Sequence, residues 1–334
     1  MNPVILPHYL FNDVKNPYGY NICIDFINQV VMEIKTFDDF LSTARKSGRR
    51  KVVVAAAHDE HVLHSVNEAY KLGLVNAVLV GDKEKILKLS DEIGLDVLKF
   101  DIIKEQDDLK SAKIAVDIAA SGEANILMKG RIMTGDLLKI VLDKGVGLRT
   151  GRVLSHVGVF ETNTYHKLLF LSDAALNIAP DLTRKADIIQ NAVNIANSLG
   201  IEKPKVAVLA AIETVNPEMQ CTLDAAVLSK MVERGQIKNC IIDGPLAMDN
   251  AINLEAALHK GIKSEVAGDA DILIVPDIES GNILHKTLVF LMKARSCAVI
   301  TGAKVPLVVT SRAEDYVAKL NSIALASIIC QNGR

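Results

Sequence analysis

The chain has 334 residues, which is about two ordinary domains by length. Hydrophobic residues make up 49% and charged residues 23%, a globular composition that excludes a disordered chain. With 38 Lys+Arg against 40 Asp+Glu, the net charge is -2, which argues against a sequence-independent nucleic-acid-binding protein because such a protein needs a basic surplus. The balance still allows a local basic pocket for a small anion.

Cysteine usage and hydropathy point to the cytoplasm. No apolar run approaches the roughly 18 residues of a membrane span, and the N-terminus lacks the basic and apolar regions of a secretory signal. The cysteines are scattered without a C-x-x-C pair, which is typical of thiols in a reducing compartment; they are Cys23, Cys221, Cys240, Cys297 and Cys330. We therefore expect a cytoplasmic protein that contacts neither membrane nor nucleic acid.

Residues 1–31 differ from the rest of the chain. They hold three of the nine prolines and three of the six tyrosines, and their apolar residues have no clear period. From Met32 onward the apolar residues follow helical spacing. We treat 1–31 as an atypical N-terminal extension and hypothesise that Met32 is the natural start. The alternative is an ordered arm that packs on a partner subunit; the intact mass of the natively expressed protein distinguishes the two.

After Arg50, short apolar runs alternate with amphipathic stretches of helical length. This alternation predicts an α/β protein with a largely parallel sheet covered on both faces. The runs are KVVVAAA, NAVLVGD, VLKFDII, ANILMKG, RVLSHVGVFE, KLLFLSD, KVAVLAA, NCIIDGP, DILIVP, SCAVITG and PLVVTS. RVLSHVGVFE and KLLFLSD follow one another without a helix, so we expect part of the sheet to be antiparallel.

About eleven strands are too many for one doubly wound sheet, so the pattern favours two α/β lobes. We expect residues 32–150 with 299–334 to form a discontinuous lobe I and residues 151–298 to form lobe II. The pattern changes near KGVGLRTG, which marks the first boundary. The active-site cleft is expected between the lobes.

Two motifs favour structural explanations. Gly145, Gly147 and Gly151 suggest a dinucleotide loop, but their spacing differs from the fingerprint and they follow a helix and precede a strand, the reverse of the required order. The triplet His58, His61 and His64 could bring two imidazoles together for a metal. With no acidic or cysteine partner assigned, we expect His58 in the strand-to-helix turn and the other two on a solvated helix face.

Polar clusters follow four of the apolar runs. They are informative because ligands of open α/β sheets bind beyond the carboxyl ends of strands. The clusters contain Lys129, Gly130, Arg131, Thr134, Asp136 and Lys139; Asp243, Gly244 and Pro245; Ser280, Gly281, Asn282, His285 and Lys286; and Ser311, Arg312, Glu314 and Asp315. We interpret Ser280, Gly281 and Asn282 as a backbone loop ahead of a helix.

The last cluster has both a structural and a functional explanation. Ser311 and Glu314 have the spacing of a capping box, which explains both residues without a ligand. A capping box does not explain Arg312, because a cation is unfavourable at the positive end of a helix. A bound anion would reverse that cost. Together the cationic turns favour a site for one or more phosphates.

At these residues the sequence resembles the phosphate acetyltransferase and phosphate butyryltransferase family from about Met32 to the end. The resemblance rests on KVVVAAAHDEHVL, ILMKGRIMTGDLLKIVLDKGVGLRTGRVLSHVGVFE, YHKLLFLSDAALNIAPDLTRK, DGPLAMDNAI, ADILIVPDIESGNILHK and VPLVVTSRAED. LRTGRVLSHV and DAALNIAPD look like the butyryltransferase branch. The resemblance implies a two-lobed, three-layer α/β/α fold like that of isocitrate and isopropylmalate dehydrogenases. It also implies a homodimer or larger homo-oligomer.

The activity that the resemblance implies is reversible: acyl-CoA and phosphate give acyl phosphate and free CoA, with a short-chain acyl group such as butyryl. Coenzyme A is a substrate, and no permanently bound cofactor or metal is implied. The catalytic residues of the family fall on Ser311, Arg312 and Asp315; the spacing to Asp315 is shorter by about two residues than in the acetyltransferases, which leaves Glu314 in competition. A family Arg falls on Lys139, and another has no clear equivalent, which weakens the acetyl assignment.

This chemistry fits the residue types. A carboxylate such as Asp315 could take the proton of the CoA thiol, whose pKa is roughly 8.5, and the Ser311 hydroxyl could donate to developing charge. Asp315→Asn is then expected to cripple turnover while leaving substrate binding largely intact. Arg312 would hold the phosphate, and further contacts with phosphate or CoA are expected from Lys129, Arg131, Thr134, Lys139, Ser280, Gly281, Asn282 and Lys286.

Three other functions compete. A phosphate acetyltransferase would keep this mechanism and change the acyl group. A metal-dependent dehydrogenase of the same fold would need clustered Asp ligands and a nucleotide loop, neither of which is convincing in the sequence. A non-catalytic module would bind CoA or phosphate without releasing thiol.

Overall fold

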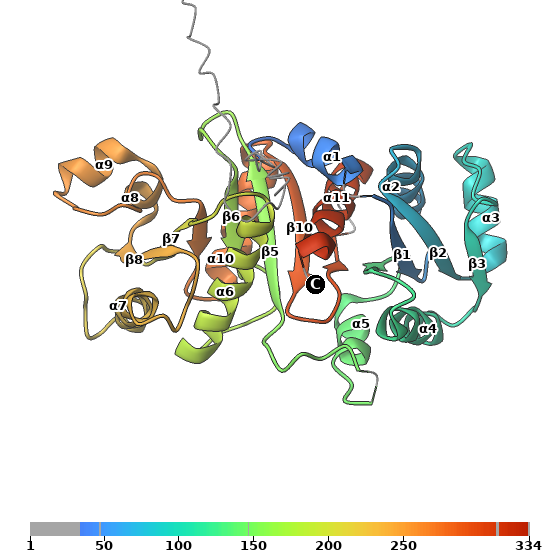
Figure 1. The fold of residues 1–334 in the computed structure, drawn as a ribbon, viewed down its shortest axis with the longest axis horizontal. Helices are drawn as coiled ribbons and strands as arrows, with labels where there is room; N and C mark the ends of the chain where they lie inside the picture. The colour runs from blue at the N-terminus through green and yellow to red at the C-terminus, as the bar shows by residue number, and fades with distance from the viewer. Residues whose placement is uncertain (1–33, 47, 146, 312–313, 333–334) are drawn as a thin grey trace, which may run out of the picture. The chain divides into compact units, whose positions relative to one another are not determined.

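A computed structural model describes residues 34–46, 48–145, 147–311 and 314–332 (Figure 1). The chain divides into two units, residues 1–32 and 33–334, and the fold described is that of the second unit. The extension at 1–31 and the candidate Arg312 lie outside the described residues.

Eleven strands hydrogen-bond into one sheet with the order β3-β2-β1-β4-β11-β10-β5-β6-β9-β7-β8. Each apolar run identified in the sequence contains or overlaps one strand, so these predictions are confirmed. The strands are β1 Arg50–Ala55, β2 Val75–Gly81, β3 Asp101–Lys104, β4 Ile126–Lys129, β5 Ser155–Glu161, β6 Leu169–Ser172, β7 Lys205–Leu209, β8 Ile241–Leu246, β9 Ile272–Ile274, β10 Arg295–Thr301 and β11 Leu307–Val308.

The sheet has two parallel sections that run in opposite directions. β3, β2, β1, β4 and β11 are parallel neighbours, and so are β6, β9, β7 and β8. Between them, β10 is antiparallel to both β11 and β5, and β5 is antiparallel to β6. The antiparallel pairing expected for 152–161 and 167–173 is confirmed. This reversal explains how eleven strands share one sheet without forming a single doubly wound unit.

Helices cover both faces of the sheet. α1, α2, α3, α6, α7 and α11 contribute to the core on one face, and α4, α5, α8, α9 and α10 to the cores on the other. The helices are α1 Phe37–Lys46, α2 Glu60–Lys71, α3 Lys83–Glu92, α4 Asp108–Ser121, α5 Thr134–Val141, α6 Leu182–Ser198, α7 Gln220–Glu233, α8 Met248–Ile252, α9 Leu254–His259, α10 Ile278–Lys286 and α11 Tyr316–Asn332, with a π-helical turn η1 at Thr287–Leu291. The chain is therefore a mixed α/β protein, as the alternation predicts.

The core is aliphatic apart from a few phenylalanines, as expected from a chain with 4% aromatic residues and no tryptophan. Among the described residues, no helix combines the length and the apolar character needed to span a membrane. The four cysteines in the described part of the chain are free thiols: Cys221, Cys240, Cys297 and Cys330. Cys23 lies outside it.

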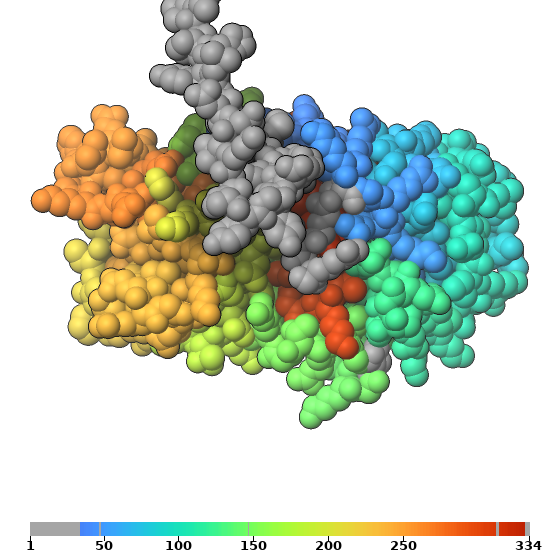
Figure 2. Space-filling model, viewed as in Figure 1, coloured from blue at the N-terminus to red at the C-terminus, as the bar shows by residue number. Residues whose placement is uncertain are grey.

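The turn between β10 and β11 packs against the loop that precedes β5. The Thr150 hydroxyl donates a hydrogen bond of 2.5 Å to the Gly302 carbonyl, and Lys304 N donates to Leu148 O at 3.0 Å. Figure 2 shows the orange-red surface of this turn beside the green surface of that loop. The C-terminal strands are thereby tied to the chain that leads into the second parallel section.

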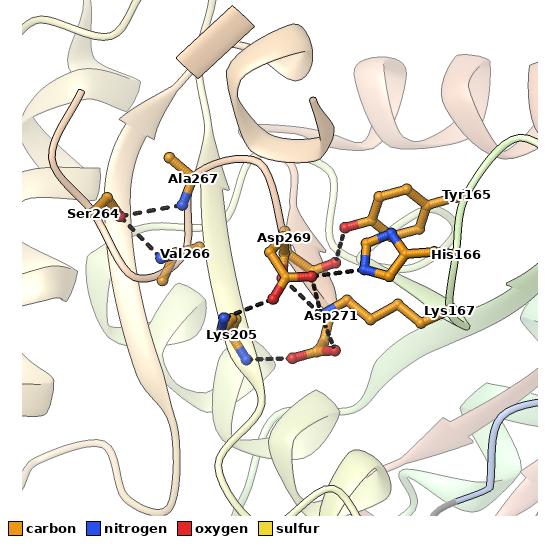
Figure 3. Close-up of polar contacts among 10 residues, drawn as sticks. Tyr165, His166, Lys167, Lys205, Ser264, Val266, Ala267, Asp269 and Asp271 are labelled. Carbon is orange, nitrogen blue, oxygen red and sulfur yellow. Dashed lines mark hydrogen bonds and ion pairs between the residues drawn. The ribbon is translucent and has the colours of Figure 1, made fainter. Parts of the chain in front are cut away.

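Ion pairs join the amino ends of β6, β7 and β9 (Figure 3). Asp269 accepts from Lys205 at 2.6 Å, from Lys167 at 2.9 Å and from the His166 ring at 2.8 Å. Lys167 also contacts Asp271 at 2.8 Å. Burial alone would raise the pKa of Asp269, but these donors outweigh it and hold the pKa well below its ordinary value.

Replacing this carboxylate tests how much the ion pairs stabilise the fold. Because the folded-state pKa of Asp269 lies below its unfolded value, its contribution is present above about pH 4 and is lost as the pH falls further. Asp269→Asn is expected to lower the free energy of unfolding at pH 7 by about 1–2 kcal/mol, since the pairs are partly solvent-screened. Urea unfolding measures this, with the exposed Glu123→Gln as the control. Equal stability of the two variants would contradict the account.

Candidate active site

The strand order of the first parallel section places a topological switch point between β1 and β4. From β1 the chain passes through α2 and α3 on one face to reach β2 and β3, and then returns through α4 on the other face to β4. The connections after β1 and β4 therefore diverge to opposite faces. Ligands of open α/β sheets bind beyond the carboxyl ends of strands at such a switch point. β11 lies beside β4 and is parallel to it, so its carboxyl end meets the same edge.

The loops after β1 and β4 approach each other closely. Gly130 N donates to Ala55 O and Arg131 N to Ala56 O, both at 2.8 Å. A Cβ on Gly130 would lie 2.2 Å from the Ala56 carbonyl oxygen, so only glycine fits there. Lys129 is 6% exposed, and its ammonium group donates to the carbonyls of Gly130 and Ile132. Lys129 thus anchors the loop that presents the exposed Arg131.

The segment after β11 lies at the same edge of the sheet, next to the loop after β4. Ser311 is exposed and lies three residues beyond the strand. Lys319, from the first turn of α11, is 3% exposed, and its ammonium group donates to Thr310 Oγ1 at 3.1 Å and to Ser311 O at 2.9 Å. Burial lowers the pKa of Lys319, against the opposing effect of nearby carboxylates. A buried cation therefore fixes the backbone at Ser311.

The two acidic residues of this segment have different surroundings. Asp315 is exposed and directly precedes α11, where its Oδ1 accepts a hydrogen bond of 2.9 Å from Ala318 N. Asp315 therefore caps the helix, so the capping box expected at Ser311 and Glu314 is not the start of α11; Glu314 N instead donates to Ser311 O in a turn before it. Glu314 is 15% exposed, and burial raises its pKa against the effects of Lys319, the Ser311 N–H and Lys286.

A half-buried histidine, His285, lies close to Glu314, and a buried histidine, His156, lies next to His285. His285 of α10 has its Nε2 3.9 Å from Glu314 Oε1, and its ring is 5.7 Å from that of His156 in β5. The Nδ1 atoms of both rings are buried without a hydrogen-bond partner. Burial lowers the pKa of each imidazole to about 4, so both are neutral near pH 7.

The first residues of α10 lie at the opposite edge of the sheet. β9 runs antiparallel to β11, so the carboxyl end of β9 faces away from the switch point. Ser280, Gly281 and Asn282 belong to α10, which corrects the expected loop, because Asp277 caps the helix by accepting from Ser280 N at 2.8 Å. Only the far end of α10, at His285 and Lys286, returns toward Glu314.

Gly281 and Asn282 are used in packing. A Cβ on Gly281 would lie 2.6 Å from the Asp173 carbonyl oxygen, and Asn282 Nδ2 donates to Ala174 O at 3.2 Å. These contacts pack the start of α10 against the loop after β6.

α5 begins at Thr134, as expected, directly after the Lys129 loop. Lys139 lies in the last turn, is 81% exposed and contacts Asp136 at 3.3 Å. Lys139 faces a pocket of about 760 Å³ between the C-terminal halves of α4 and α5, which is lined by Lys113, Asp117, Ala120, Ser121, Lys139, Ile140, Asp143 and Gly145. Thr134 is thus near the candidate site, whereas Lys139 points into a separate pocket.

The histidine triplet is only partly as expected. His58 lies in the turn between β1 and α2, but it is buried and has an acidic neighbour, since its Nε2 is 3.5 Å from Asp108 Oδ1. His61 is exposed on α2. The solvated position expected for His64 is wrong, because its ring packs on Tyr316 of α11 with centroids 4.2 Å apart. No cluster of three or more potential metal ligands occurs within the described ranges.

Sequence reasoning missed Lys319 and gave His285 no role. A lysine within the apolar run of the last helix was an available signal for the former. His285 offered none, because its approach to Glu314 depends on α10 crossing back over the sheet.

Comparisons with known proteins agree with the earlier resemblance. A family model described as "Phosphate acetyl/butaryl transferase" matches residues 36–121 and 110–327. A phosphate butyryltransferase from Clostridium acetobutylicum is 47% identical over 299 residues, which is 90% of this chain and 99% of that protein. A phosphate acetyltransferase from Thermotoga maritima is 47% identical over 291 residues, covering 87% and 98%.

A solved structure is also similar. The branched-chain phosphotransacylase from Enterococcus faecalis V583 superimposes with a TM-score of 0.73 at 32% identity, covering 84% of this chain and 99% of that one.

The close approach of the two loops can be tested at Gly130. Gly130→Ala is expected to lower the free energy of unfolding by about 1–3 kcal/mol, because the new methyl group overlaps backbone carbonyls. Gly135→Ala is the matched control, since its Cβ meets no atom within 4 Å and alanine favours a helix by about 0.5–1 kcal/mol. Urea unfolding compares the two variants. A Gly130→Ala protein as stable as the wild type would contradict the packing described.

The buried imidazole of His156 predicts a pH dependence of stability. Its folded-state pKa, about 4, lies below the unfolded value near 6.5, so protons favour the unfolded chain and stability is lost as the pH falls from 6.5 to 4. The loss from this group is about 3 kcal/mol over that range. His156→Phe is expected to remove this component when unfolding free energies are measured between pH 7.5 and 4.5. Parallel curves for the two proteins would show that His156 does not titrate in this way.

Proposed function

Because the chain belongs to the phosphate acetyl/butyryl transferase family, we propose that it transfers an acyl group reversibly between coenzyme A and inorganic phosphate. We place this reaction at the switch point between β1 and β4. The observation that supports this most is the 47% identity to a phosphate butyryltransferase over nearly the whole length of that protein. Family membership also favours the transferase over the dehydrogenase and over the non-catalytic module.

In the proposed mechanism the Ser311 hydroxyl and Arg312 stabilise charge on the reacting acyl and phosphate groups, and one carboxylate of the pair Glu314 and Asp315 takes the thiol proton. The placement of Ser311 on the edge shared with Lys129 supports this arrangement. The role of Arg312 rests on the sequence alone. Donors held by the fold need no reorganisation as charge develops, which is why a fixed backbone at Ser311 favours catalysis.

Substrate contacts are proposed for the cations around this edge. Arg131 is exposed at the switch point, and Lys286 is close enough to Glu314 to lower its pKa, so both are placed to attract phosphate groups. Thr134 starts α5, whose N-terminal N–H groups favour anions. Lys129 acts by shaping its loop, and Lys139 is proposed to contact a remote part of CoA. Contacts with phosphate or CoA are also proposed for Ser280, Gly281 and Asn282, which lie in the first half of α10.

The acyl group is proposed to be butyryl or another short chain. The relatives are named for butyryl and acetyl transfer, and the solved structure for branched chains. The absent equivalent of one acetyltransferase arginine favours the four-carbon group. Acetyl transfer is the second candidate, supported by the equal identity to the Thermotoga maritima protein.

The finer architecture is also a proposal. We propose two lobes, residues 32–150 with 299–334 and residues 151–298, in an isocitrate and isopropylmalate dehydrogenase-like arrangement with the cleft between them. The reversal of strand direction between the two parallel sections supports this division. We further propose a cytoplasmic homodimer or larger homo-oligomer without a permanently bound cofactor. Sedimentation of the purified protein tests the assembly.

The function is tested by measuring free thiol release from acetyl-CoA, butyryl-CoA and isobutyryl-CoA, with and without phosphate. We expect release that depends on phosphate and is fastest with a four-carbon thioester. Preference for acetyl-CoA would keep the mechanism and replace the acyl assignment. Thiol release that is equal with and without phosphate for every thioester would overturn the transferase.

A further inference from the structure

Building on the proposed function, we propose that Glu314 is the general base that takes the proton of the CoA thiol, and that His285 is a positioning residue for its carboxylate. This differs from the spacing-based match, which favours Asp315. The inference rests on where the two carboxylates lie and on what each one contacts.

Asp315 already has a structural role, as the cap of α11. Its Oδ1 accepts a hydrogen bond of 2.9 Å from Ala318 N, and its side chain is exposed to solvent. Protonating this carboxylate would weaken the helix cap and so destabilise the start of α11. Transfer of a proton to Asp315 would therefore act against the helix that supports the site.

Glu314 has the surroundings of a base. Its side chain is 15% exposed, so little water competes for the carboxylate, and burial raises its pKa toward that of the thiol. The groups that face it are the Ser311 N–H and Asp315 from its own segment, Lys286 and His285 from α10, Lys319 from α11 and the buried Cys297 thiol from β10. Lys319 and Lys286 act against this burial effect and favour the ionised form of the carboxylate.

His285 lies where it can orient Glu314. Its Nε2 is 3.9 Å from Glu314 Oε1, and catalytic hydrogen bonds are often long before substrate binds. Its ring is held edge-on to Phe160 at 5.2 Å, and its buried Nδ1 has no hydrogen-bond partner. A neutral imidazole has one N–H and one acceptor nitrogen, so an unpartnered Nδ1 is consistent with a proton on Nε2, directed at the carboxylate.

In the CoA-consuming direction the CoA thiol attacks the acyl carbon of the acyl phosphate. The S–H bond breaks and its proton passes to Glu314, while the sulfur electron pair forms a bond to the acyl carbon. The bond between that carbon and the bridging phosphate oxygen breaks, and phosphate leaves with the electron pair and takes up the proton from Glu314, which restores the carboxylate. In the reverse direction Glu314 takes the proton from phosphate and passes it to the departing thiolate. No other reactant is needed.

The assignment is tested by comparing Glu314→Gln, Glu314→Asp and Asp315→Asn in the forward and reverse assays. Glu314→Gln is expected to lower kcat about 100-fold, with KM for CoA changed less than about threefold. Glu314→Asp should retain more activity than Glu314→Gln despite its shorter side chain, because it keeps a carboxylate. Asp315→Asn should mainly lower the unfolding temperature. The exposed Glu265→Gln is the neutral control.

The pH profile separates a base from a structural role. As the pH rises toward the thiol pKa of roughly 8.5, the thiolate forms without help, so the deficit of Glu314→Gln should shrink. A deficit that is constant with pH, or a larger kcat loss in Asp315→Asn than in Glu314→Gln, would overturn the assignment. Absence of phosphate-dependent thiol release in the wild type would instead overturn the proposed function itself.

His285 is tested with His285→Phe and His285→Asn. The Phe variant removes the N–H, so we expect kcat to fall about tenfold, KM to stay within about threefold and the acid limb of the kcat profile to move to higher pH. The Asn variant can still donate and should recover part of the loss. An unchanged acid limb in His285→Phe, or no recovery with Asn, would overturn the positioning role.

Discussion

The candidate site depends on the contact between two backbone loops at the switch point. Gly130 lies against the carbonyls of Ala55 and Ala56, and the hydrogen bonds to these carbonyls fix the directions in which the chain leaves β1 and β4. The same contact fixes the position from which Arg131 leaves β4 at the switch point. The chemistry that we propose therefore begins with a steric requirement, namely a position where no side chain fits.

Buried charge is the second constraint on this edge. Lys129 and Lys319 are both almost fully buried, and each ammonium group is stabilised by oxygen atoms of the loop that it supports. Burying a cation is costly unless it is hydrogen-bonded, so these lysines hold their loops in definite conformations. The same segment leaves Glu314 poorly solvated and Asp315 exposed, which gives neighbouring carboxylates different chemical properties.

Much of this could be predicted from the sequence because strands at a parallel sheet's centre are continuous apolar runs. The eleven runs, the antiparallel pair and the start of α5 after Lys129 all follow from local pattern. The first residues of α10 and α11 do not follow from local pattern. Asp277 and Asp315 cap these helices, but other residues nearby in the sequence compete for the same capping role. The packing of His64 on Tyr316 and the approach of His285 to Glu314 join residues remote in sequence, which no local pattern encodes.

The most direct measurement of the central claim follows the oxygen atoms of phosphate. The protein is incubated with butyryl-CoA and phosphate carrying four 18O atoms, and the products are followed by 31P NMR together with free thiol. Direct transfer predicts an acyl phosphate that retains all four labelled oxygens and forms in step with free CoA. Release of free thiol with butyrate as the acyl product, and labelled phosphate left unacylated, would show hydrolysis and contradict the account.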